Sequence, residues 1–236
     1  MIRLVVFDLD GTLVDSQKDI ADAANALIAD LGGSPLADET IAAMVGDGAA
    51  LLVRRALATA DLDPSTPGAL DAFLRLYDEH LLRHTRPYEG MLEVLRRLHA
   101  GRRISVLTNK PSGATMRILR ELAFEPLLDG VVGGDTPLGR KPDPAGLQAL
   151  IAAAHSTPET TLLVGDSSID LETSRRAGTA VCLARYGFGY RFAGPEFRGD
   201  EFFIDSPRGL LDVIPAIDQG IAARRAGRHD CGASPG

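Results

Sequence analysis

Two acidic residues stand two positions apart directly after the first hydrophobic segment of the chain. Residues 2–7 read Ile-Arg-Leu-Val-Val-Phe, which is typical of a buried strand, and Asp8 and Asp10 follow with only Leu9 between them. Side chains alternate between the two faces of a strand, so we expect both carboxylates to point the same way. Two carboxylates in one small space repel each other unless a cation joins them. The spacing therefore favours a metal ion beside one nucleophilic carboxylate, completed by residues far along the chain.

Further polar residues follow three later predicted strands, over residues 103–108, 131–133 and 161–164. In an open parallel sheet, working residues collect at the carboxyl ends of the strands, where helix N-termini also present N–H groups to anions. We therefore expect acids, a hydroxyl and lysine to converge at one edge of the sheet. The segments concerned are Thr108-Asn109-Lys110, Arg140-Lys141-Pro142-Asp143-Pro144 and Gly165-Asp166-Ser167-Ser168-Ile169-Asp170.

Composition narrows the class of protein. The chain has 236 residues, 45% of them hydrophobic, which is enough for one large domain or one domain with a smaller insert. A net charge of −7 argues against a nucleic-acid binder, because such proteins bind phosphates with a basic surface. No apolar run approaches a membrane span, and no signal peptide is evident. Cys182 and Cys231 are too few for a disulfide framework, which favours a cytoplasmic setting.

The order of predicted elements divides the chain into a discontinuous core and an insert. Helical periodicity alone is found over residues 20–31, 38–45, 49–60 and 69–82, so residues 17–85 are expected to form an all-α cap domain. Strands and helices alternate from residue 86 onward, which predicts a Rossmann-like α/β core with a parallel sheet and helices on both faces, formed by residues 1–16 and 86–236. A last helix is expected over 209–221, and residues 222–236 are expected to be a poorly ordered tail.

With these motifs in order, the chain resembles the haloacid dehalogenase-like superfamily, specifically its phosphatases with a small helical cap. Asp-x-Asp-Gly-Thr after a strand, Thr at the end of the next core strand, Lys-Pro, and Gly-Asp-x-x-x-Asp stand in the family's order. Each motif alone is weak, but an accidental ordered set is improbable.

The resemblance implies a role for each core residue. Asp8 would attack phosphorus and become an aspartyl-phosphate, and Asp10 would be general acid and then general base. Lys141 would offset the charge of nucleophile and phosphate. The groups expected to contact the phosphoryl group are the backbone at Gly11, the hydroxyls of Thr12 and Thr108, and the N–H of Asn109.

The resemblance also implies a metal site. Its expected ligands are the carboxylates of Asp8 and Asp166, the backbone carbonyl of Asp10, and Asp170 directly or through water. Hard oxygen ligands beside a phosphate favour Mg²⁺.

Several of these residues have simpler interpretations. Asp15 and Ser16 are read as helix caps, and Asp170 could merely begin a helix, where a carboxylate suits the dipole. Thr108 alone could be an ordinary strand residue, and Lys141 a solvated loop charge. The ordered motif set is what favours the catalytic interpretation of the last two.

The cap segment over residues 44–57 resembles the Val-Gly-x-Gly…Leu-x-x-Arg-Ala-Leu segment of phosphoglycolate phosphatases. Gly46 and Gly48 would open a loop facing the core, and the next helix could receive a substrate carboxylate. Arg55 matches the family's arginine and would pair with that anion, or it is only a solvated charge; the two interpretations are equal on the sequence.

The leading hypothesis is an Mg²⁺-dependent phosphatase for a small acidic phosphomonoester, 2-phosphoglycolate. Pyrophosphate and amino-sugar phosphates are alternative substrates, since related enzymes use a similar core. A sugar-phosphate mutase remains a second hypothesis, and a catalytically idle binding protein on the same fold a third. The expected partner is a small phosphorylated molecule, with no nucleic acid or membrane, and monomer or homodimer remain undetermined.

Overall fold

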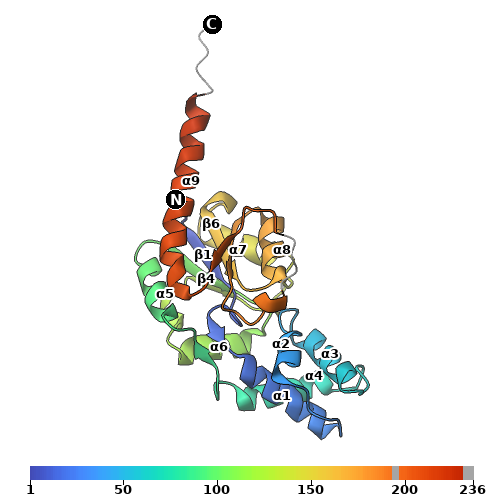
Figure 1. Ribbon diagram of the computed structural model, residues 1–236. Helices are drawn as coiled ribbons and strands as arrows, with labels where there is room; N and C mark the ends of the chain where they lie inside the picture. The colour runs from blue at the N-terminus through green and yellow to red at the C-terminus, as the bar shows by residue number, and fades with distance from the viewer. Residues whose placement is uncertain (193–196, 231–236) are drawn as a thin grey trace.

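A six-stranded parallel sheet forms the centre of the computed structural model, which describes residues 1–192 and 197–230 (Figure 1). Its strand order is β5-β4-β1-β6-β7-β8. The strands are β1 (Leu4–Phe7), β4 (Arg103–Leu107), β5 (Gly130–Val132), β6 (Thr161–Gly165), β7 (Ala180–Ala184) and β8 (Phe202–Ile204). The predicted α/β class is confirmed, and the segment carrying the two acids lies between strands from much later in the chain.

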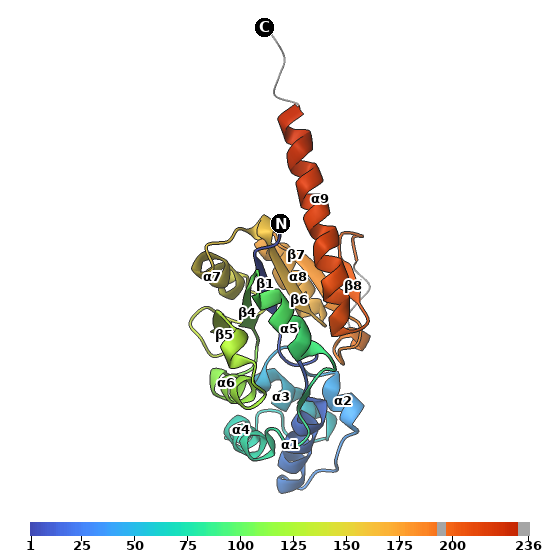
Figure 2. The ribbon, with the colours of Figure 1, turned by 90° about the vertical axis from the view of Figure 1, so that its left-hand side faces the viewer.

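Strand β1 is central because its residues are apolar on both faces. Val5 and Phe7 belong to the hydrophobic core on one side of the sheet, whereas Leu4 and Val6 pack with Leu147 on the other. Burial on both faces is the usual condition of a parallel strand. Helices cover both sides of the sheet (Figure 2). On the Phe7 side lie α5 (Met91–His99), α6 (Ser112–Glu121) and α9 (Leu210–Asp230), and on the Leu4 side lie α7 (Ala145–Ala153) and α8 (Ser168–Ala177).

Four helices form a cap at the carboxyl edge of the sheet. Residues 17–85 contain no strand, as predicted. The cap helices are α1 (Gln17–Asp30), α2 (Asp38–Ala42), α3 (Ala49–Thr59) and α4 (Ala69–His80). A short antiparallel ribbon of β2 (Val14–Asp15) and β3 (Arg86–Pro87), which the sequence did not predict, joins cap and core. Single 3₁₀ turns occupy Glu125–Leu127, Pro158–Thr160, Tyr190–Phe192 and Pro207–Gly209.

Asp19 fastens the two chain segments that cross between cap and core. Its carboxylate is fully buried at the start of α1. It accepts hydrogen bonds from the backbone N–H of His84 at 2.8 Å and of Thr85 at 2.9 Å, and from the Thr85 hydroxyl at 2.6 Å. A buried carboxylate with this many donors is well satisfied, so the entry and exit of the cap are held together.

The ends of several helices differ from the sequence prediction, the last helix most. Helix α8 begins at Ser168, where Ser167 and Asp170 form a capping box at its N-terminus. Helix α9 continues to Asp230 instead of ending near residue 221, so residues 222–230 of the predicted tail have a helical backbone. The alanine and arginine residues of this stretch are strong helix formers. Residues 231–236 of the predicted tail lie outside the described part of the chain.

Candidate active site

Asp8 and Asp10 line one cavity of about 290 Å³ between the sheet and the cap, as their spacing predicted. The reason differs from the prediction, however, because β1 ends at Phe7 and both acids lie beyond it. After Asp8 the chain turns, with N–H groups of Thr12 and Leu13 donating to the Leu9 carbonyl. A turn, and not strand alternation, therefore brings the two carboxylates to the same cavity.

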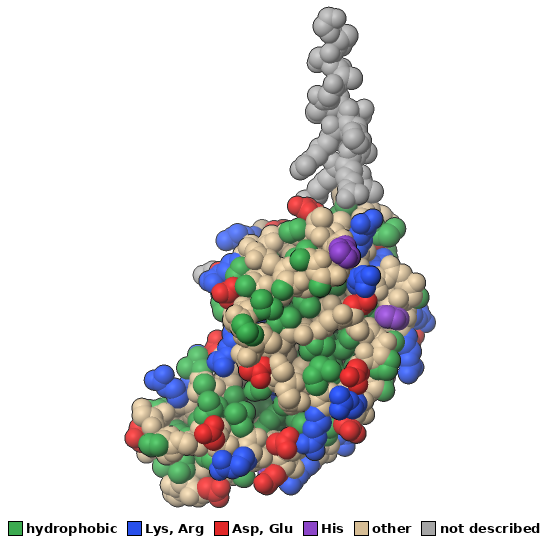
Figure 3. Space-filling model, turned by 180° about the vertical axis from the view of Figure 1, so that it is seen from behind, with side chains coloured by type: hydrophobic (Ala, Val, Ile, Leu, Met, Phe, Trp, Pro, Cys, Tyr) green, Lys and Arg blue, Asp and Glu red, His purple; other side chains and the backbone are tan. Residues whose placement is uncertain are grey.

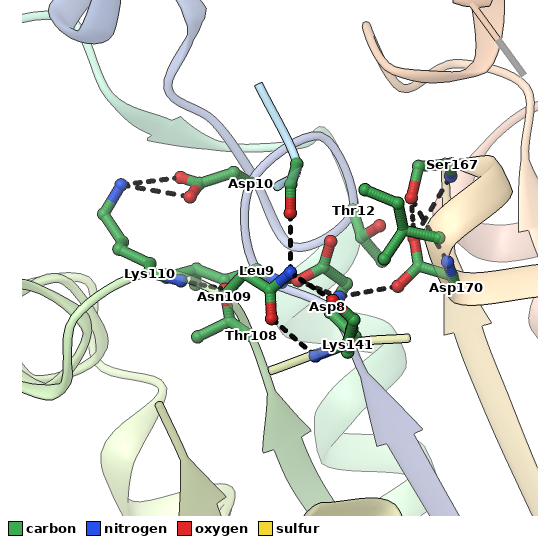
Figure 4. Close-up of polar contacts among 12 residues, drawn as sticks. Asp8, Leu9, Asp10, Thr12, Thr108, Asn109, Lys110, Lys141, Ser167 and Asp170 are labelled. Carbon is green, nitrogen blue, oxygen red and sulfur yellow. Dashed lines mark hydrogen bonds and ion pairs between the residues drawn. The ribbon is translucent and has the colours of Figure 1, made fainter. Parts of the chain in front are cut away.

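Each of these acids has its own buried lysine (Figure 4). Lys141 Nζ lies 2.8 Å from Asp8 Oδ1, and Lys110 Nζ lies 2.9 and 3.0 Å from the two oxygens of Asp10. Both lysine side chains are nearly inaccessible to solvent. Each carboxylate is thus paired with its own cation; the sequence analysis assigned a role to Lys141 and none to Lys110, although Lys110 stands in a segment expected at this edge.

Lys141 joins Asp8 to Asp170. Its ammonium group also lies 2.6 Å from Asp170 Oδ1, and the Asp170 carboxylate is fully buried. Burial lowers the pKa of Lys141, but the carboxylates of Asp170 and Asp8 outweigh it and raise that pKa above its ordinary value. Lys141 is therefore held charged, and its interpretation as a solvated loop charge is wrong.

Asn109 holds the backbone of Lys141 in place. Its Nδ2 donates to the Lys141 carbonyl at 2.9 Å, and its Oδ1 accepts from the Lys141 N–H at 2.8 Å. The same Nδ2 donates to the carbonyl of Gly46 in the cap at 2.8 Å. The side chain of Asn109, for which the sequence predicted only a backbone role, thus connects the β4 end, the Lys141 loop and the cap.

Three buried carboxylates could hold a metal ion. Oxygens of Asp8, Asp166 and Asp170 lie within 4.8 Å of one another. Burial, together with Asp170 and Asp8, raises the pKa of Asp166 well above its ordinary value. Burial also raises the pKa of Asp8 to about 7. The positive charge of Lys141 lowers this pKa, and the negative charges of Asp170 and Asp10 raise it. An added cation would relieve this repulsion, and an all-oxygen donor set suits a hard divalent ion such as Mg²⁺.

Glycines surround Asp166 so closely that side chains would collide with it. A Cβ added to Gly11 would lie 1.9 Å from Asp166 Oδ2, one added to Gly187 2.3 Å from the Asp166 Cβ, and one added to Gly189 2.8 Å from Oδ2. The Gly189 N–H donates to Asp166 Oδ2 at 2.8 Å, and the Thr12 hydroxyl lies 3.5 Å from Oδ1. The donor set and this glycine cradle both fit a small cation.

The carboxylates of the predicted metal set are not equivalent. The Oδ2 of Asp170 accepts a hydrogen bond from the Ser167 hydroxyl at 2.6 Å, and its Oδ1 pairs with Lys141. Asp170 therefore both caps the first turn of α8 and belongs to the charged cluster. The side chain of Asp10 lies outside the cluster of three carboxylates, on Lys110. For Asp10 the sequence predicted a backbone ligand only.

Ser16 contacts Asp10 and does not cap α1. It stands at the N-cap position, but its side chain makes no capping hydrogen bond, and its hydroxyl donates to Asp10 Oδ1 at 2.6 Å. The interpretation of Ser16 as a side-chain cap was therefore wrong. Sequence reasoning gave neither Ser16 nor Lys110 a role beside Asp10. The signal for Lys110 was its place in the Thr108-Asn109-Lys110 segment expected at this edge of the sheet.

The cap contributes an apolar wall to the cavity. The lining from the cap includes Val45, Leu52, Phe73 and Leu74, and the lining from the core includes Thr108. Hydrophobic side chains are visible along the seam between cap and core in Figure 3, while acidic and basic side chains intersperse over the rest of that face. The two sides of the cavity thus differ in chemistry, with most charges on the core side and mainly hydrocarbon on the cap side, where Asp78 also belongs to the lining.

Gly46 and Gly48 both line this cavity, as predicted for the cap loop. Gly48 is the N-cap of α3 and has a φ of +92°, which L side chains rarely adopt. A Cβ there would lie 3.4 Å from both the Asn109 carbonyl oxygen and Arg140 Nη1, so the loop runs close to the core.

Arg55 is not brought to the cavity. Its guanidinium group pairs with Asp47 at 2.5 Å, its side chain is 43% exposed, and it is absent from the cavity lining. The sequence interpretation of Arg55 as a partner of a substrate anion therefore does not fit the structure. Arg55 lies about one helical turn after the lining residue Leu52. Its side chain leaves the helix in a direction about 60° away from that of Leu52, and it reaches Asp47 and solvent instead of the cavity.

The chain belongs to the haloacid dehalogenase-like hydrolase family, because the family's model matches residues 5–184. This span includes both cap and core motifs and confirms the resemblance seen in the sequence. Among its relatives is the phosphoglycolate phosphatase of Rhodospirillum rubrum, which is 41% identical over 197 residues, covering 80% of this chain and 81% of the relative. A plasmid phosphoglycolate phosphatase of Cupriavidus necator is 37% identical over 218 residues, covering 90% and 91%.

The fold is shared with a solved structure described as a predicted phosphoglycolate phosphatase from Haemophilus somnus. The match has a TM-score of 0.83 and 29% identity, and it covers 90% of this chain and 98% of that chain. Family, relatives and fold together make this chain a phosphatase that acts on a small phosphorylated substrate. Within the described residues, no helix is both long and apolar enough to cross a membrane.

Proposed function

We propose that this phosphatase hydrolyses a small acidic phosphomonoester, 2-phosphoglycolate, to glycolate and phosphate. The observation that carries the proposal is one cavity with two separately paired acids on its core side and an apolar cap opposite. The substrate named for the relatives, phosphoglycolate, supports the choice. A cavity with this wall suits a short carbon skeleton better than a polyhydroxylated sugar, which disfavours the mutase and amino-sugar alternatives.

In the proposed first step, a carboxylate oxygen of Asp8 attacks phosphorus. An Asp8–phosphate bond forms as the bond from phosphorus to the leaving oxygen breaks, and Asp10 gives its proton to that oxygen. Lys141 stays beside Asp8 and offsets the added negative charge. The hydroxyl of Thr108, which is buried and lines the cavity, would bind a phosphoryl oxygen.

In the proposed second step, Asp10 takes a proton from a water molecule, whose oxygen attacks phosphorus. The Asp8–phosphate bond breaks, phosphate leaves, and Asp8 is a free carboxylate again. The hydrogen bonds from Lys110 and Ser16 hold the Asp10 side chain in one position for both steps. A general acid or base must lie within hydrogen-bond reach of the proton it transfers, so a fixed position serves both steps.

Mg²⁺ is proposed as the cofactor, held by Asp8 and Asp166 with Asp170 nearby and the Asp10 carbonyl as a further ligand. When bound, it would neutralise part of the phosphate charge and orient the phosphoryl group. Residues 17–85 are proposed to act as a cap domain that moves about the β2–β3 ribbon and excludes water when closed. A cytoplasmic location completes the proposal, on the sequence argument given above.

The test is phosphate release, with and without Mg²⁺, from 2-phosphoglycolate, pyrophosphate, a hexose phosphate and an amino-sugar phosphate. We expect kcat/KM for phosphoglycolate to exceed the others by at least about tenfold, since recognition of an additional charged group contributes about 1.5–3 kcal/mol. Equal and low values on the whole panel would overturn the substrate assignment while leaving the phosphatase class intact.

A further inference from the structure

Lys110 is the only lysine or arginine among the described residues that line the cavity. Its ammonium group contacts both oxygens of Asp10 and also lies 4.4 Å from the ring centre of Tyr77, on helix α4 of the cap. Lys141 is absent from the lining, and Arg55 pairs with Asp47. A substrate that carries a carboxylate besides its phosphate therefore meets one cationic side chain in the described lining of this cavity, that of Lys110.

The hydroxyl of Tyr77 is buried and makes no hydrogen bond of normal geometry within the described residues, and the charged group beside it is the Lys110 ammonium. The side chain lines the same cavity, and Tyr77 is only 5% exposed. A buried hydroxyl without a hydrogen bond costs about 1–3 kcal/mol, and a ligand that accepts a hydrogen bond from Tyr77 would recover this energy. Burial raises the pKa of Tyr77 to about 12, despite Lys110, and the hydroxyl stays a proton donor at neutral pH.

We propose that Lys110 and Tyr77 form a carboxylate subsite that selects substrates carrying a second anionic group close to the phosphate. This rests on the proposed function and names the residues that recognise the acidic end of the substrate. The Lys110 ammonium would pair with the carboxylate, and the Tyr77 hydroxyl would donate to it. The apolar side chains of the cap strengthen such a pair, because water competes less for the charges, and the cap carboxylate that also lines the cavity, Asp78, is paired with Arg117.

The subsite is divided between the two parts of the molecule. Lys110 follows core strand β4, whereas Tyr77 belongs to cap helix α4. A carboxylate bound between them contacts both parts at once and therefore favours the closed cap. A phosphate ester without a carboxylate leaves the Tyr77 hydroxyl unpaired on closure. Selectivity follows from this difference, which is independent of the chemistry at Asp8.

The experiment compares 2-phosphoglycolate with 2-hydroxyethyl phosphate, which is similar in size and lacks the carboxylate. The change Lys110→Met removes the charge and keeps most of the side-chain length. It also deprives Asp10 of its cation, but that effect is common to both substrates, so the ratio of their kcat/KM values isolates recognition. We expect the preference for phosphoglycolate to fall by about 10–100-fold, as for loss of a charged hydrogen bond.

Tyr77→Phe removes only the unpaired hydroxyl and provides a variant that keeps the fold. We expect it to lower the preference for phosphoglycolate by about threefold to tenfold, the range of one neutral hydrogen bond, mainly through KM. Lys18→Met is the matched control, because Lys18 is an exposed cap lysine paired with Asp22. It should leave the ratio unchanged.

Binding gives a readout that does not depend on turnover. In an Asp8→Asn background, calorimetry should show that Lys110→Met weakens phosphoglycolate binding and leaves binding of inorganic phosphate within about threefold. If wild type shows no preference for phosphoglycolate over 2-hydroxyethyl phosphate, the proposed function fails. If wild type prefers phosphoglycolate and both variants keep that preference and affinity, the proposed function stands and the subsite is overturned.

Discussion

The two walls of the cavity differ in how their polar groups are paired. The core wall carries charged groups that are paired with one another: Lys141 lies between Asp8 and Asp170, and Lys110 lies on Asp10. The cap wall is mainly apolar, and within the described part of the chain the Tyr77 hydroxyl makes no hydrogen bond of normal geometry. Apart from the proposed metal ion, the charged groups of the core side are therefore already in place, whereas the cap side gains its polar contacts only when a ligand binds.

This contrast predicts that changes on the core wall abolish the reaction and changes on the cap wall alter selectivity. The strongest test is Asp8→Asn, which keeps the shape of the side chain and removes the nucleophile. We expect kcat to fall by about 10⁴-fold or more, in line with loss of other enzymic nucleophiles. Phosphate release measures the rate, and circular dichroism should report an unchanged fold. Residual activity within about a hundredfold of wild type would exclude Asp8 as nucleophile.

A somewhat smaller loss is expected for Lys141→Met. Its removal leaves Asp8 and Asp170 as buried carboxylates without their shared cation. We expect the free energy of unfolding to fall by about 3–5 kcal/mol, and kcat by about 10³-fold because the charge on the phosphoryl group is no longer offset. Denaturant titration and steady-state kinetics measure the two quantities. An unchanged free energy of unfolding would show that the buried pairs contribute little to the fold.

The pH dependence of metal-free protein is a third way to probe the core wall. In the folded chain Asp8 has its pKa raised from 3.8 to about 7, so it holds a proton over a pH range where the unfolded chain has lost it. The stability that this proton contributes is fully present below pH 3.8 and is lost as the pH rises toward about 7. We expect the Tm in the presence of a chelator to fall between about pH 4 and 7.

Addition of Mg²⁺ should restore Tm most at high pH, because metal ions bind the deprotonated carboxylates. Thermal scans at pH 5 and pH 8, with Mg²⁺ or chelator, measure the difference. Equal stabilisation at both pH values would argue against a metal held by Asp8 and Asp166.

The smallest effect is expected for Arg55→Ala on the outer side of the cap. Arg55 pairs with Asp47 and is partly exposed, so its loss removes one surface ion pair worth up to about 1 kcal/mol. We expect kcat/KM for phosphoglycolate to change by less than about threefold, in contrast to Lys110→Met. A rise of tenfold or more in KM for phosphoglycolate alone would show that Arg55 contributes to substrate binding. It would contradict the assignment of selectivity to the inner wall of the cap.

The sequence predicted the core wall well because its signals are local. The strands predicted over residues 103–108, 131–133 and 161–164 agree with β4, β5 and β6 within one residue at each end, and the first strand begins two residues later than predicted. Residue types at the strand ends indicated Asp8 and Asp166, and the ordered family motifs indicated Lys141; the structure brings the three residues together. The β2–β3 ribbon was missed because strands of two residues carry no periodicity.

The partners of Asp10 and the inner face of the cap were beyond local signals. Ser16 precedes a helix, where a hydroxyl normally caps, and only the turn after β1 explains why it donates to Asp10 instead. Tyr77 lies 33 positions before Lys110 in the sequence, and nothing in either segment indicates that the ring covers the ammonium group. Such contacts depend on how the cap sits on the core, which is a tertiary property.

The central claim is that the core wall performs the reaction through a covalent phosphate on Asp8. The most direct test is to quench the enzyme during turnover of phosphoglycolate with Mg²⁺, reduce any acyl phosphate with borohydride, and sequence the peptides by mass spectrometry. The account predicts homoserine at position 8 and unmodified aspartate at position 10. Homoserine at position 10, or no homoserine anywhere in a sample in which the intermediate was shown by radiolabelled phosphate to accumulate, would contradict it.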